Sequence, residues 1–289
     1  MKKFILLFIV VLIQQLSSDQ LVADTKDYAN AFPYKDGSLL NVGSKSFQCD
    51  KSTASNKLEI PGISSGESII THTAYSLVYS EPHEQAKWVA YQLTNSETNN
   101  MVKRSNKFIS DPMVKTGTAG NKDYAGSGYD KGHLAPAADM GWSSKTMAES
   151  FYYSNMSPQE PGFNRGVWKR LEELVREWAN ENQAIYIVTG PVLTNGLPSI
   201  GPDKVSVPAY YYKVILDYTE PSIKGIGFIL PNKGSIEPLQ EYAVTIDSVE
   251  KFTGIDFFPS LPDDQETKIE KLLCLKCWTW NINQNQRGS

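Results

Sequence analysis

The 289-residue sequence has little of several features that would simplify its classification. Beyond its first two dozen residues it contains no long hydrophobic run and no low-complexity segment. No repeat of fixed period is visible either, which excludes solenoid and propeller architectures. Hydrophobic residues make up 40% and charged residues 21% of the chain, a globular balance. A chain of this length can bury a core without a stabilising metal or disulfide, in one large domain or two small ones.

Cysteine is scarce. The sequence contains only Cys49, Cys274 and Cys277. The spacing of Cys274 and Cys277 is one that zinc ligands use, but a second pair at such a spacing is missing, which argues against a zinc site. We expect a structural disulfide with one thiol left over. The sequence leaves open which two cysteines pair.

The chain also lacks an overall excess of positive charge. Its formal net charge of −4 argues against a protein that coats nucleic acid along its whole surface. Two segments are nevertheless basic, residues 103–131 with a net charge of +3 and residues 164–176 with a net charge of +2. Each alone is typical of a solvated face, but both lie beside the motifs described below.

The first 23 residues have the order of a secretory signal. Lys2 and Lys3 precede an apolar run over residues 4–13, and small and polar residues follow, with cleavage expected after Ser18 or Ala23. Ten apolar residues are too few to span a bilayer, which needs about 20, although an uncleaved anchor is the alternative. We therefore expect a secreted or periplasmic protein without stable membrane association after cleavage, in a compartment that permits disulfides.

Hydrophobic patterning predicts an α+β fold. Residues 24–57 form an irregular extension, and one domain is expected over residues 58–280. A helix is predicted over residues 164–180, where apolar side chains recur at helical spacing. Strands occur in groups on either side of this helix, which favours a mainly antiparallel central sheet flanked by helices. The predicted strands are 69–79 and 87–93, which form a hairpin, and 184–190, 210–216 and 226–230.

Only one of the three histidines has the setting of a catalytic base. His72 falls within the predicted strand 69–79, where a hydrogen-bonded structural role is expected, and His83 falls in an exposed polar turn. His133 follows a glycine-rich loop over residues 124–129 and adjoins Gly132, a residue that allows close approach of backbone. The ordinary histidine pKa of about 6.5 suits a general base.

The predicted helix adds a second group of candidates. Asn164, Trp168, Glu172 and Arg176 are four residues apart, so they form a row that drifts by about 40° per step from the apolar face toward solvent. An amide oxygen, a carboxylate and a guanidinium along this row could hold a hydrated magnesium ion beside a phosphate. The alternative is an ordinary amphipathic helix with a Glu172–Arg176 pair and Trp168 in the core.

Several motifs, in the same order along the chain, resemble those of one enzyme family and include these candidate residues. The segment Asp130-Lys131-Gly132-His133 resembles the Asp-Arg-Gly-His signature of the DNA/RNA non-specific endonuclease family, whose members include endonuclease G and secreted bacterial nucleases. This family has the ββα-metal (His-Me) finger. The resemblance spans about residues 58–272, and further matching blocks lie at 155–159, 164–168, 171–172, 188–191, 227–232 and 253–258.

The resemblance implies a role for each matching residue. It implies that His133 is the general base, that Asn164 is the direct metal ligand, and that Glu172 holds water on the metal. It further implies phosphate contacts for Arg176 and Arg104 and a place for Asn155 close to the metal site, where we expect it to contact substrate. Lys131 stands where the family usually has arginine, so the positive charge is kept but the two-pronged guanidinium is lost.

The resulting hypothesis is a metal-dependent endonuclease. DNA and RNA are the expected substrates, with products that carry 5′-phosphate ends and with magnesium as the cofactor or manganese in its place. In this hypothesis His133 removes a proton from the attacking water. Two alternatives are a catalytically silent nucleic-acid-binding protein on the same fold and a hydrolase of a non-nucleic phosphodiester. The sequence does not define an oligomeric state.

Overall fold

The computed structural model describes residues 57–281 of the chain. The predicted signal over residues 1–23 and the extension up to residue 56 lie outside the described residues, and the predicted domain boundaries at 58 and 280 stay predictions. The α-helices are α2 Asn121–Tyr124, α3 Ser144–Glu149, α4 Lys169–Glu181, α5 Ile246–Thr253 and α6 Asp263–Lys271. Short 3-10 helices cover Glu81–His83, Asn95–Thr98, Tyr153–Asn155, Leu239–Tyr242 and Leu275–Cys277, and a π-helix covers Phe163–Trp168.

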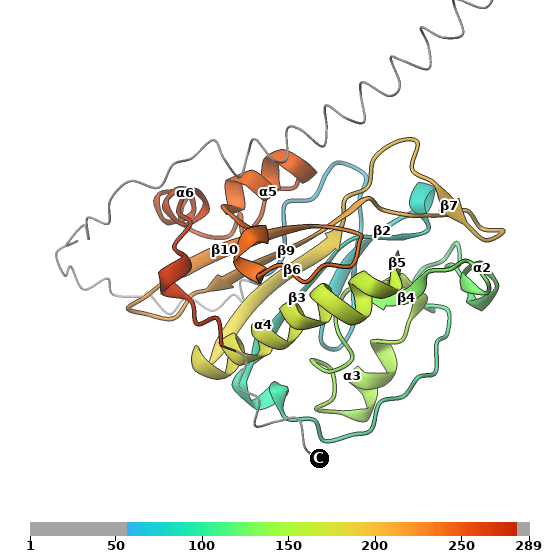
Figure 1. Ribbon diagram of the computed structural model, residues 1–289, viewed down its shortest axis with the longest axis horizontal. Helices are drawn as coiled ribbons and strands as arrows, with labels where there is room; N and C mark the ends of the chain where they lie inside the picture. The colour runs from blue at the N-terminus through green and yellow to red at the C-terminus, as the bar shows by residue number, and fades with distance from the viewer. Residues whose placement is uncertain (1–56, 282–289) are drawn as a thin grey trace, which may run out of the picture. The chain divides into compact units, whose positions relative to one another are not determined.

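The central sheet has seven strands in the order β1-β2-β3-β6-β9-β10-β11, and every neighbouring pair is antiparallel (Figure 1). Its strands are β1 Ile69–Thr71, β2 Ser76–Ser80, β3 Gln85–Thr94, β6 Ala184–Pro191, β9 Tyr210–Asp217, β10 Lys224–Pro231 and β11 Ala243–Val244. Two small antiparallel sheets pair β4 Asp130–His133 with β5 Met156–Gln159 and β7 Ser199–Ile200 with β8 Val205–Ser206. The predicted α+β fold with a mainly antiparallel sheet is confirmed.

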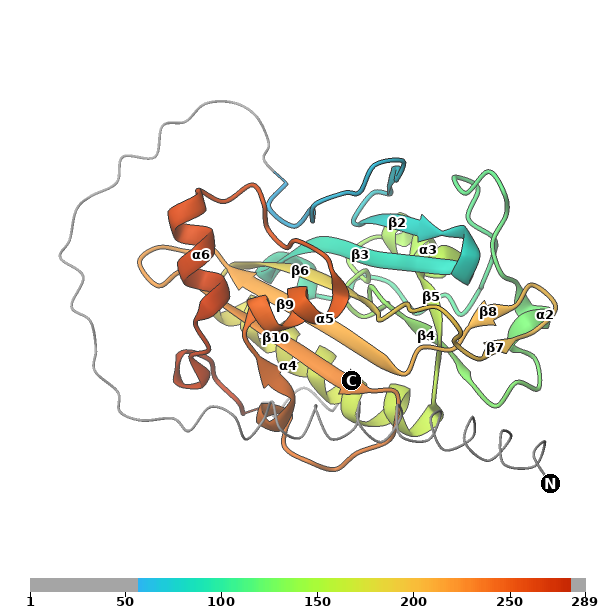
Figure 2. The ribbon, with the colours of Figure 1, turned by 90° about the horizontal axis from the view of Figure 1, so that it is seen from above.

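Helices cover both faces of the central sheet. Figures 1 and 2 show α4 across one face and α5 with α6 across the other. Side chains of β9 alternate between the two faces of the sheet, so this strand contributes to the core on each side. Tyr211 and Ile215 pack on the α4 side. Tyr212 and Val214 pack on the side of α5 and α6. A strand buried on both faces has no solvated side, which makes any charged residue within it notable.

The predicted hairpin is present, but its first half is two strands instead of one. Strand β1 ends at Thr71, and the backbone N–H of His72 donates a hydrogen bond of 2.8 Å to the carbonyl of Tyr75, which closes a turn before β2 begins at Ser76. The prediction of a continuous strand was therefore wrong at residues 72–75. His72 lies in this turn, where Nε2 contacts Asp111 at 2.8 Å, so its expected structural role is met by a partner distant in sequence.

The predicted helix 164–180 is two helices. Residues 163–168 form a π-helix, and α4 follows from Lys169 to Glu181. A kink lies inside the first of these, at Gly166, whose φ of −111° and ψ of −107° are not helical. Asn164 and Trp168 thus lie before the regular helix on which Glu172 and Arg176 lie, and the single straight row was wrong. The apolar stripe is confirmed: Val167, Leu171, Leu174, Val175 and Trp178 are all buried.

The small β4–β5 sheet and the helix after it form the ββα unit. Gly132 in β4 pairs with Ser157 in β5, and a side chain at position 132 would meet the buried side chain of Gln159 at 2.1 Å. Only glycine fits there without moving Gln159, so the packing of Gln159 explains why the residue before His133 is glycine.

Cys274 and Cys277 form a disulfide, so this pair is not a zinc site. Cys49 lies outside the described residues. No helix within residues 57–281 is long and apolar enough to cross a membrane.

Candidate active site

His133 is the last residue of β4 and is almost enclosed. It is 8% exposed, and its ring lies between two aromatic side chains, with centroids 4.8 Å from Phe151 in an edge-on contact and 5.9 Å from Phe108. Nε2 is buried and accepts or donates no hydrogen bond with any residue from 57 to 281. A buried imidazole nitrogen without a protein partner is available to a substrate or to water.

The surroundings of His133 keep the imidazole neutral. Burial and the nearby Arg104 guanidinium lower the pKa of His133 to about 3. Arg104 itself is exposed to solvent, with Cζ 5.0 Å from the ring centre of Phe151 and Nε donating to Asn106 at 2.9 Å. A neutral imidazole can accept a proton, and the arginine beside it offers a fixed positive charge to an anionic substrate.

Asn155 braces the segment that carries His133. Its amide oxygen accepts from the N–H of Ala135 at 2.8 Å, and its amide nitrogen donates to the carbonyls of Ala135 and Ser150 at 2.9 and 2.8 Å. The residue is fully buried. All of these bonds go to main chain, so Asn155 supports the two residues after His133 and does not present its amide to a substrate as we had expected.

Asn164 is oriented by a carboxylate from the other half of the ββα unit. Its Nδ2 donates a hydrogen bond of 2.9 Å to Asp130 in β4, and Arg165 donates to the same carboxylate through Nε at 2.8 Å. Burial would raise the pKa of Asp130, but the bonds from Arg165 and Asn164 lower it, so the carboxylate stays ionised. The amide oxygen of Asn164 accepts no hydrogen bond from the described residues and is free to bind a cation.

A second charged group lies on α4. Arg176 donates to Asp139 at 2.8 Å instead of to Glu172, so the Glu172–Arg176 pair of the alternative interpretation does not form. Asp139 is buried and also accepts from the Tyr91 hydroxyl at 2.8 Å. Burial would lower the pKa of Arg176, but the attraction of Asp139 outweighs it and raises the pKa. The ion pair holds the Arg176 side chain, which is only 18% exposed and does not extend into solvent as the row on the predicted helix suggested.

Glu172 and Lys213 attract each other electrostatically inside this group. Burial raises the pKa of Glu172 to about 7, against the attraction of Lys213 and Arg176. Lys213 lies in β9 and is fully buried, with Nζ 4.8 Å from the ring centre of Trp168 and no hydrogen-bond partner among residues 57–281. Burial lowers its pKa to about 8, and Glu172 opposes that change. Trp168 is in the core as expected, and its ring also packs beside the ammonium group of Lys213.

Lys131 shares an aromatic neighbour with the histidine. Its Nζ lies 4.3 Å from the ring centre of Phe108, the ring that also contacts His133, and it donates to the amide oxygen of Asn121 at 2.9 Å. The side chain is half-buried. Its charge therefore lies against a ring that also contacts His133.

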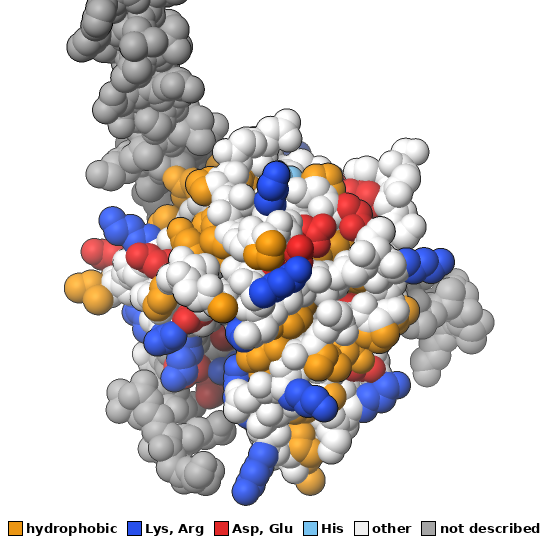
Figure 3. Space-filling model, turned by 90° about the vertical axis from the view of Figure 1, so that its right-hand side faces the viewer, with side chains coloured by type: hydrophobic (Ala, Val, Ile, Leu, Met, Phe, Trp, Pro, Cys, Tyr) orange, Lys and Arg blue, Asp and Glu red, His pale blue; other side chains and the backbone are white. Residues whose placement is uncertain are grey.

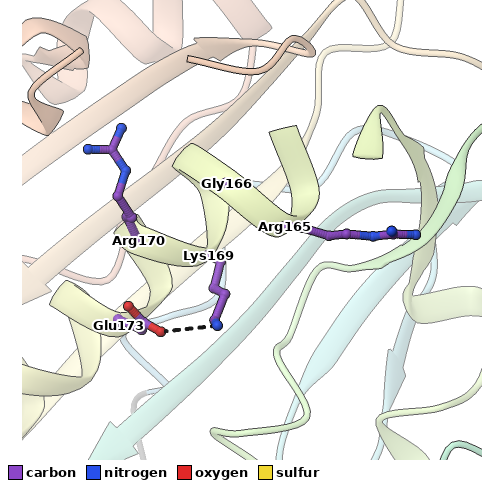
Figure 4. Close-up of a pocket in the computed structure, with 5 residues that line it drawn as sticks. All are labelled: Arg165, Gly166, Lys169, Arg170 and Glu173. Atoms are coloured by element: carbon purple, nitrogen blue, oxygen red, sulfur yellow. Dashed lines mark ion pairs between the residues drawn. The ribbon is translucent and has the colours of Figure 1, made fainter. Parts of the chain in front are cut away.

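The surface charge near the site is dispersed. Figure 3 shows lysine and arginine side chains scattered over one face among apolar and acidic ones. A shallow pocket at the start of α4 is lined by Arg165, Gly166, Lys169, Arg170 and Glu173 (Figure 4). Its cations diverge, because Arg165 bonds to Asp130, Lys169 pairs with Glu173 at 3.6 Å, and Arg170 donates to the carbonyls of Ser235 and Glu237. The basic segment 164–176 is therefore largely neutralised, and this pocket is not a focused anion site.

Asp139 and Lys213 are the residues of the site to which the sequence reasoning assigned no role. Lys213 did carry a signal, since it interrupts the apolar run Tyr210–Leu216, and lysine is almost never fully buried unless it is paired. Asp139 had no local signal that marked it, because its partner Arg176 is 37 residues away. The aromatic rings of Phe108 and Phe151 had no periodic signal at all.

A histidine at the end of a β-hairpin, with an amide and a carboxylate on the helices that follow, defines the ββα-metal class of nuclease fold. The chain belongs to the DNA/RNA non-specific endonuclease family, whose model matches residues 54–264, so the predicted membership is confirmed.

The chain is similar to named members of this class. It is 36% identical to the mitochondrial nuclease EXOG of Danio rerio over 211 residues, which cover 67% of this chain and 62% of that protein. It is 34% identical to mitochondrial endonuclease G of Bos taurus over 220 residues, covering 71% and 73% of the two chains. A nuclease of Nostoc sp. is 34% identical over 214 residues, with 70% and 77% covered.

The fold is also similar to a solved structure. A crystal structure of EndoG in complex with EndoGI matches with a TM-score of 0.66 and 32% identity, covering 72% of this chain and 91% of that one. The chain spans about three fifths of the length of the EXOG nucleases that it matches.

Proposed function

We propose that the protein is a divalent-metal-dependent endonuclease that hydrolyses phosphodiester bonds of DNA and RNA with little regard to sequence. One observation carries the proposal: a neutral, buried His133 with an unpartnered Nε2 lies beside the exposed cation Arg104 on the ββα unit of a nuclease family. A base and a fixed positive charge are what hydrolysis of an anionic diester requires.

The donor atoms of the site suit magnesium, with manganese as the substitute. Asn164 offers an amide oxygen while Asp130 holds its nitrogen, and the Glu172 carboxylate makes no hydrogen bond to the described residues. Neutral and anionic oxygens are the ligands that these hard cations prefer, and magnesium keeps most of its waters. We propose that Asn164 binds the metal directly and that Glu172 orients its water. When bound, the metal neutralises charge on the phosphoryl oxygen and on the departing 3′ oxygen.

The residues of the chain itself supply proton transfer, phosphate contacts and positioning. His133 accepts the proton of the water that attacks phosphorus in line with the 3′ oxygen, which leaves a 5′ phosphate. Arg104 contacts a non-bridging phosphate oxygen, and Lys131 adds positive charge beside the base. Arg176 is held by Asp139, so we assign it a positioning role next to Glu172, together with the electrostatic effect of its charge. Asn155 positions His133 through the main chain of Ala135.

The proposal is tested by incubating the full-length protein with supercoiled plasmid and with RNA, in magnesium and in excess chelator. We expect both polymers to be cut in magnesium, with no discrete bands at limit digestion, and neither to be cut in chelator. The product ends should accept a 5′ label from polynucleotide kinase only after phosphatase treatment. A gel shift of the plasmid without cleavage would favour a silent binding protein, and hydrolysis of small diesters alone would favour another substrate class.

We also propose that residues 1–23 are a secretory signal. Support comes from the basic start and short apolar run of the sequence. The EXOG and endonuclease G relatives are named as mitochondrial proteins, so the location of this protein needs its own test. The N-terminal residue of the mature protein decides it: cleavage after Ser18 or Ala23 is expected, and an intact Met1 in the cell fraction would contradict it.

A further inference from the structure

A cluster of five carboxylates lies on the face of the sheet opposite α4. It is built by α5, α6 and the loop between them, two helices that lie side by side in Figures 1 and 2. The cluster consists of two overlapping triads, and in each triad one oxygen per residue lies within 4.8 Å of the others. Glu270 belongs to both. The triads are Asp247, Glu250 and Glu270, and Asp256, Glu266 and Glu270.

The negative charge of this cluster is not balanced by protein cations. None of the ion pairs among residues 57–281 includes any of its five members. Within this range, one hydrogen bond reaches a carboxylate of the cluster, from the Phe257 N–H to Glu250 at 2.8 Å. Burial and then the neighbouring carboxylates raise the pKa of Glu270 to about 8, and the pKa values of Glu250 and Glu266 are raised as well. The groups repel one another in their present positions.

Glu270 gives the second, independent observation. Its side chain is only 8% exposed, and Oε1 is buried without a hydrogen-bond partner among the described residues. Buried polar atoms are ordinarily paired, so an unpartnered carboxylate oxygen on the residue that both triads share points to a ligand that is a cation.

The backbone holds these acids in place. Each helix contributes an apolar residue next to an acidic one, and the apolar residues dock against glycines of β10. A side chain at Gly225 would meet Ile246 and Ile269 at 2.6 and 2.8 Å, and one at Gly227 would meet Val249 at 2.5 Å. Asp247, Glu250 and Glu270 directly follow these three apolar residues in the sequence. The close docking therefore fixes the backbone from which these three carboxylates extend.

We propose that the α5–α6 cluster binds a calcium ion, with Glu270 as its central ligand. Calcium takes six to eight oxygens at flexible geometry from mono- or bidentate carboxylates, which two triads sharing one residue can supply together with water. Magnesium needs near-octahedral geometry and keeps most of its waters, so it fits this crowded anionic set less well. The site lies across the sheet from His133, and its effect is on stability and not on the chemistry.

Thermal unfolding of the full-length protein tests this site without any nuclease assay. In the Asn164→Ala background, which removes the proposed active-site ligand, calcium should raise the Tm over that in chelator. The rise should be about 5–10 °C at a concentration a hundredfold above the dissociation constant. Glu270→Gln should abolish this rise and should not lower the Tm in chelator, because it removes repulsion. Glu241→Gln, an exposed acid outside both triads, should keep the full rise.

Two further variants cover the case in which Glu270→Gln does not fold. Glu266→Gln and Asp256→Asn lie nearer the surface, and each should reduce the calcium-dependent rise and weaken calcium binding in titration calorimetry. No rise in the Asn164→Ala protein, or an equal rise in the Glu270→Gln, Glu266→Gln and Asp256→Asn proteins, would overturn the proposal. Neither result would bear on the nuclease proposal, which depends on cleavage.

Discussion

The side-chain nitrogen of Asn164 donates a hydrogen bond of 2.9 Å to the carboxylate of Asp130, which turns the amide oxygen of Asn164 away from that carboxylate. Sequence separation between the two residues is 34. Asp130 of β4 thus orients the side chain of Asn164, which we propose as the metal ligand. In metal sites, residues that hold a ligand in this way typically contribute 10–100-fold to metal affinity.

Asn164→Ala should therefore raise the magnesium concentration for half-maximal cleavage, and Asp130→Ala should raise it by about 10–100-fold through loss of orientation. Initial rates of plasmid relaxation across a magnesium titration measure both effects. Asp203→Ala is the matched control. Asp203 is also an acid with a side-chain partner, but that partner is Lys122, at 3.3 Å, and not Asn164. Unchanged titrations in both site variants would remove the Asn164–Asp130 pair from the metal site.

Lys213 should set the ionisation of Glu172. The attraction of the buried ammonium lowers the pKa of Glu172 from the value that burial alone would impose, so Lys213→Met should raise that pKa. An opposite charge in such proximity typically shifts a pKa by about 1–3 units. In the Lys213→Met protein, the acidic limb of the plot of kcat/KM against pH should move to higher pH by a similar amount, and activity should partly recover at pH 9. In the Lys213→Arg protein, the acidic limb should stay at the wild-type pH.

A purely structural role for Lys213 would give another result. Lys224→Met serves as the control, because Lys224 is mostly buried and pairs with Asp217 at 3.0 Å, with its Nζ 4.8 Å from the ring centre of Trp278. It should lower the Tm and leave the pH profile in place. If Lys213→Met also lowers only the Tm, Lys213 does not act on Glu172.

Lys131 should contribute through its charge. The side chain rests on Phe108 beside His133, so Lys131→Arg should keep most of the cleavage rate and Lys131→Ala should lose much of it. Rates at matched magnesium and salt decide the matter, with the exposed Lys122→Ala as control. Equal rates in the wild-type, arginine and alanine proteins would mean that Lys131 is a surface residue without a part in the reaction.

His133 should make the metal-free protein sensitive to acid. Burial and Arg104 lower its folded pKa to about 3, below the value of about 6.5 in an unfolded chain. The unfolded state therefore binds the extra proton between these pH values, and stability falls as the pH is lowered through that window. Between pH 7 and pH 5 the wild type should lose about 2 kcal/mol more unfolding free energy than His133→Gln.

Urea denaturation in chelator at the two pH values measures this difference. His83→Gln is the control, because His83 is half-buried with a hydrogen bond of 2.9 Å to Ser206 and should contribute far less. An equal loss of stability in the wild-type and His133→Gln proteins would show that the imidazole is not held neutral by its surroundings.

Local patterns predicted most of the fold. Alternation and apolar runs located β3, β6, β9 and β10, and the stripe through Leu171, Val175 and Trp178 located α4. The break at His72 and the π-helix at Asn164 were not predictable, because a four-residue turn and a helix of slightly different period leave the hydrophobic pattern nearly unchanged. Here tertiary contacts and the backbone of Gly166 decide the conformation.

The family resemblance predicted His133 as the base and Asn164 as the metal ligand, and both roles stay predictions. The structure explains Gly132 by the side chain of Gln159 beside it. Asp139 and Lys213, which act on Arg176 and Glu172 of α4, were not found, because each lies far from its partner in the sequence. Asn155 was found with the wrong expectation, because sequence cannot tell an amide that faces a substrate from one that is bonded to buried main chain.

The cleavage rate of His133→Ala is the most direct measurement of the proposed mechanism. It should be determined on supercoiled plasmid at saturating magnesium, for protein whose fold is verified by circular dichroism, beside His83→Ala as a control. General-base catalysis contributes typically about 10²–10⁴-fold, so His133→Ala should be slower by a factor in that range while His83→Ala stays close to the wild type. A folded His133→Ala protein that keeps half of the wild-type rate would contradict the assignment of His133 as the base.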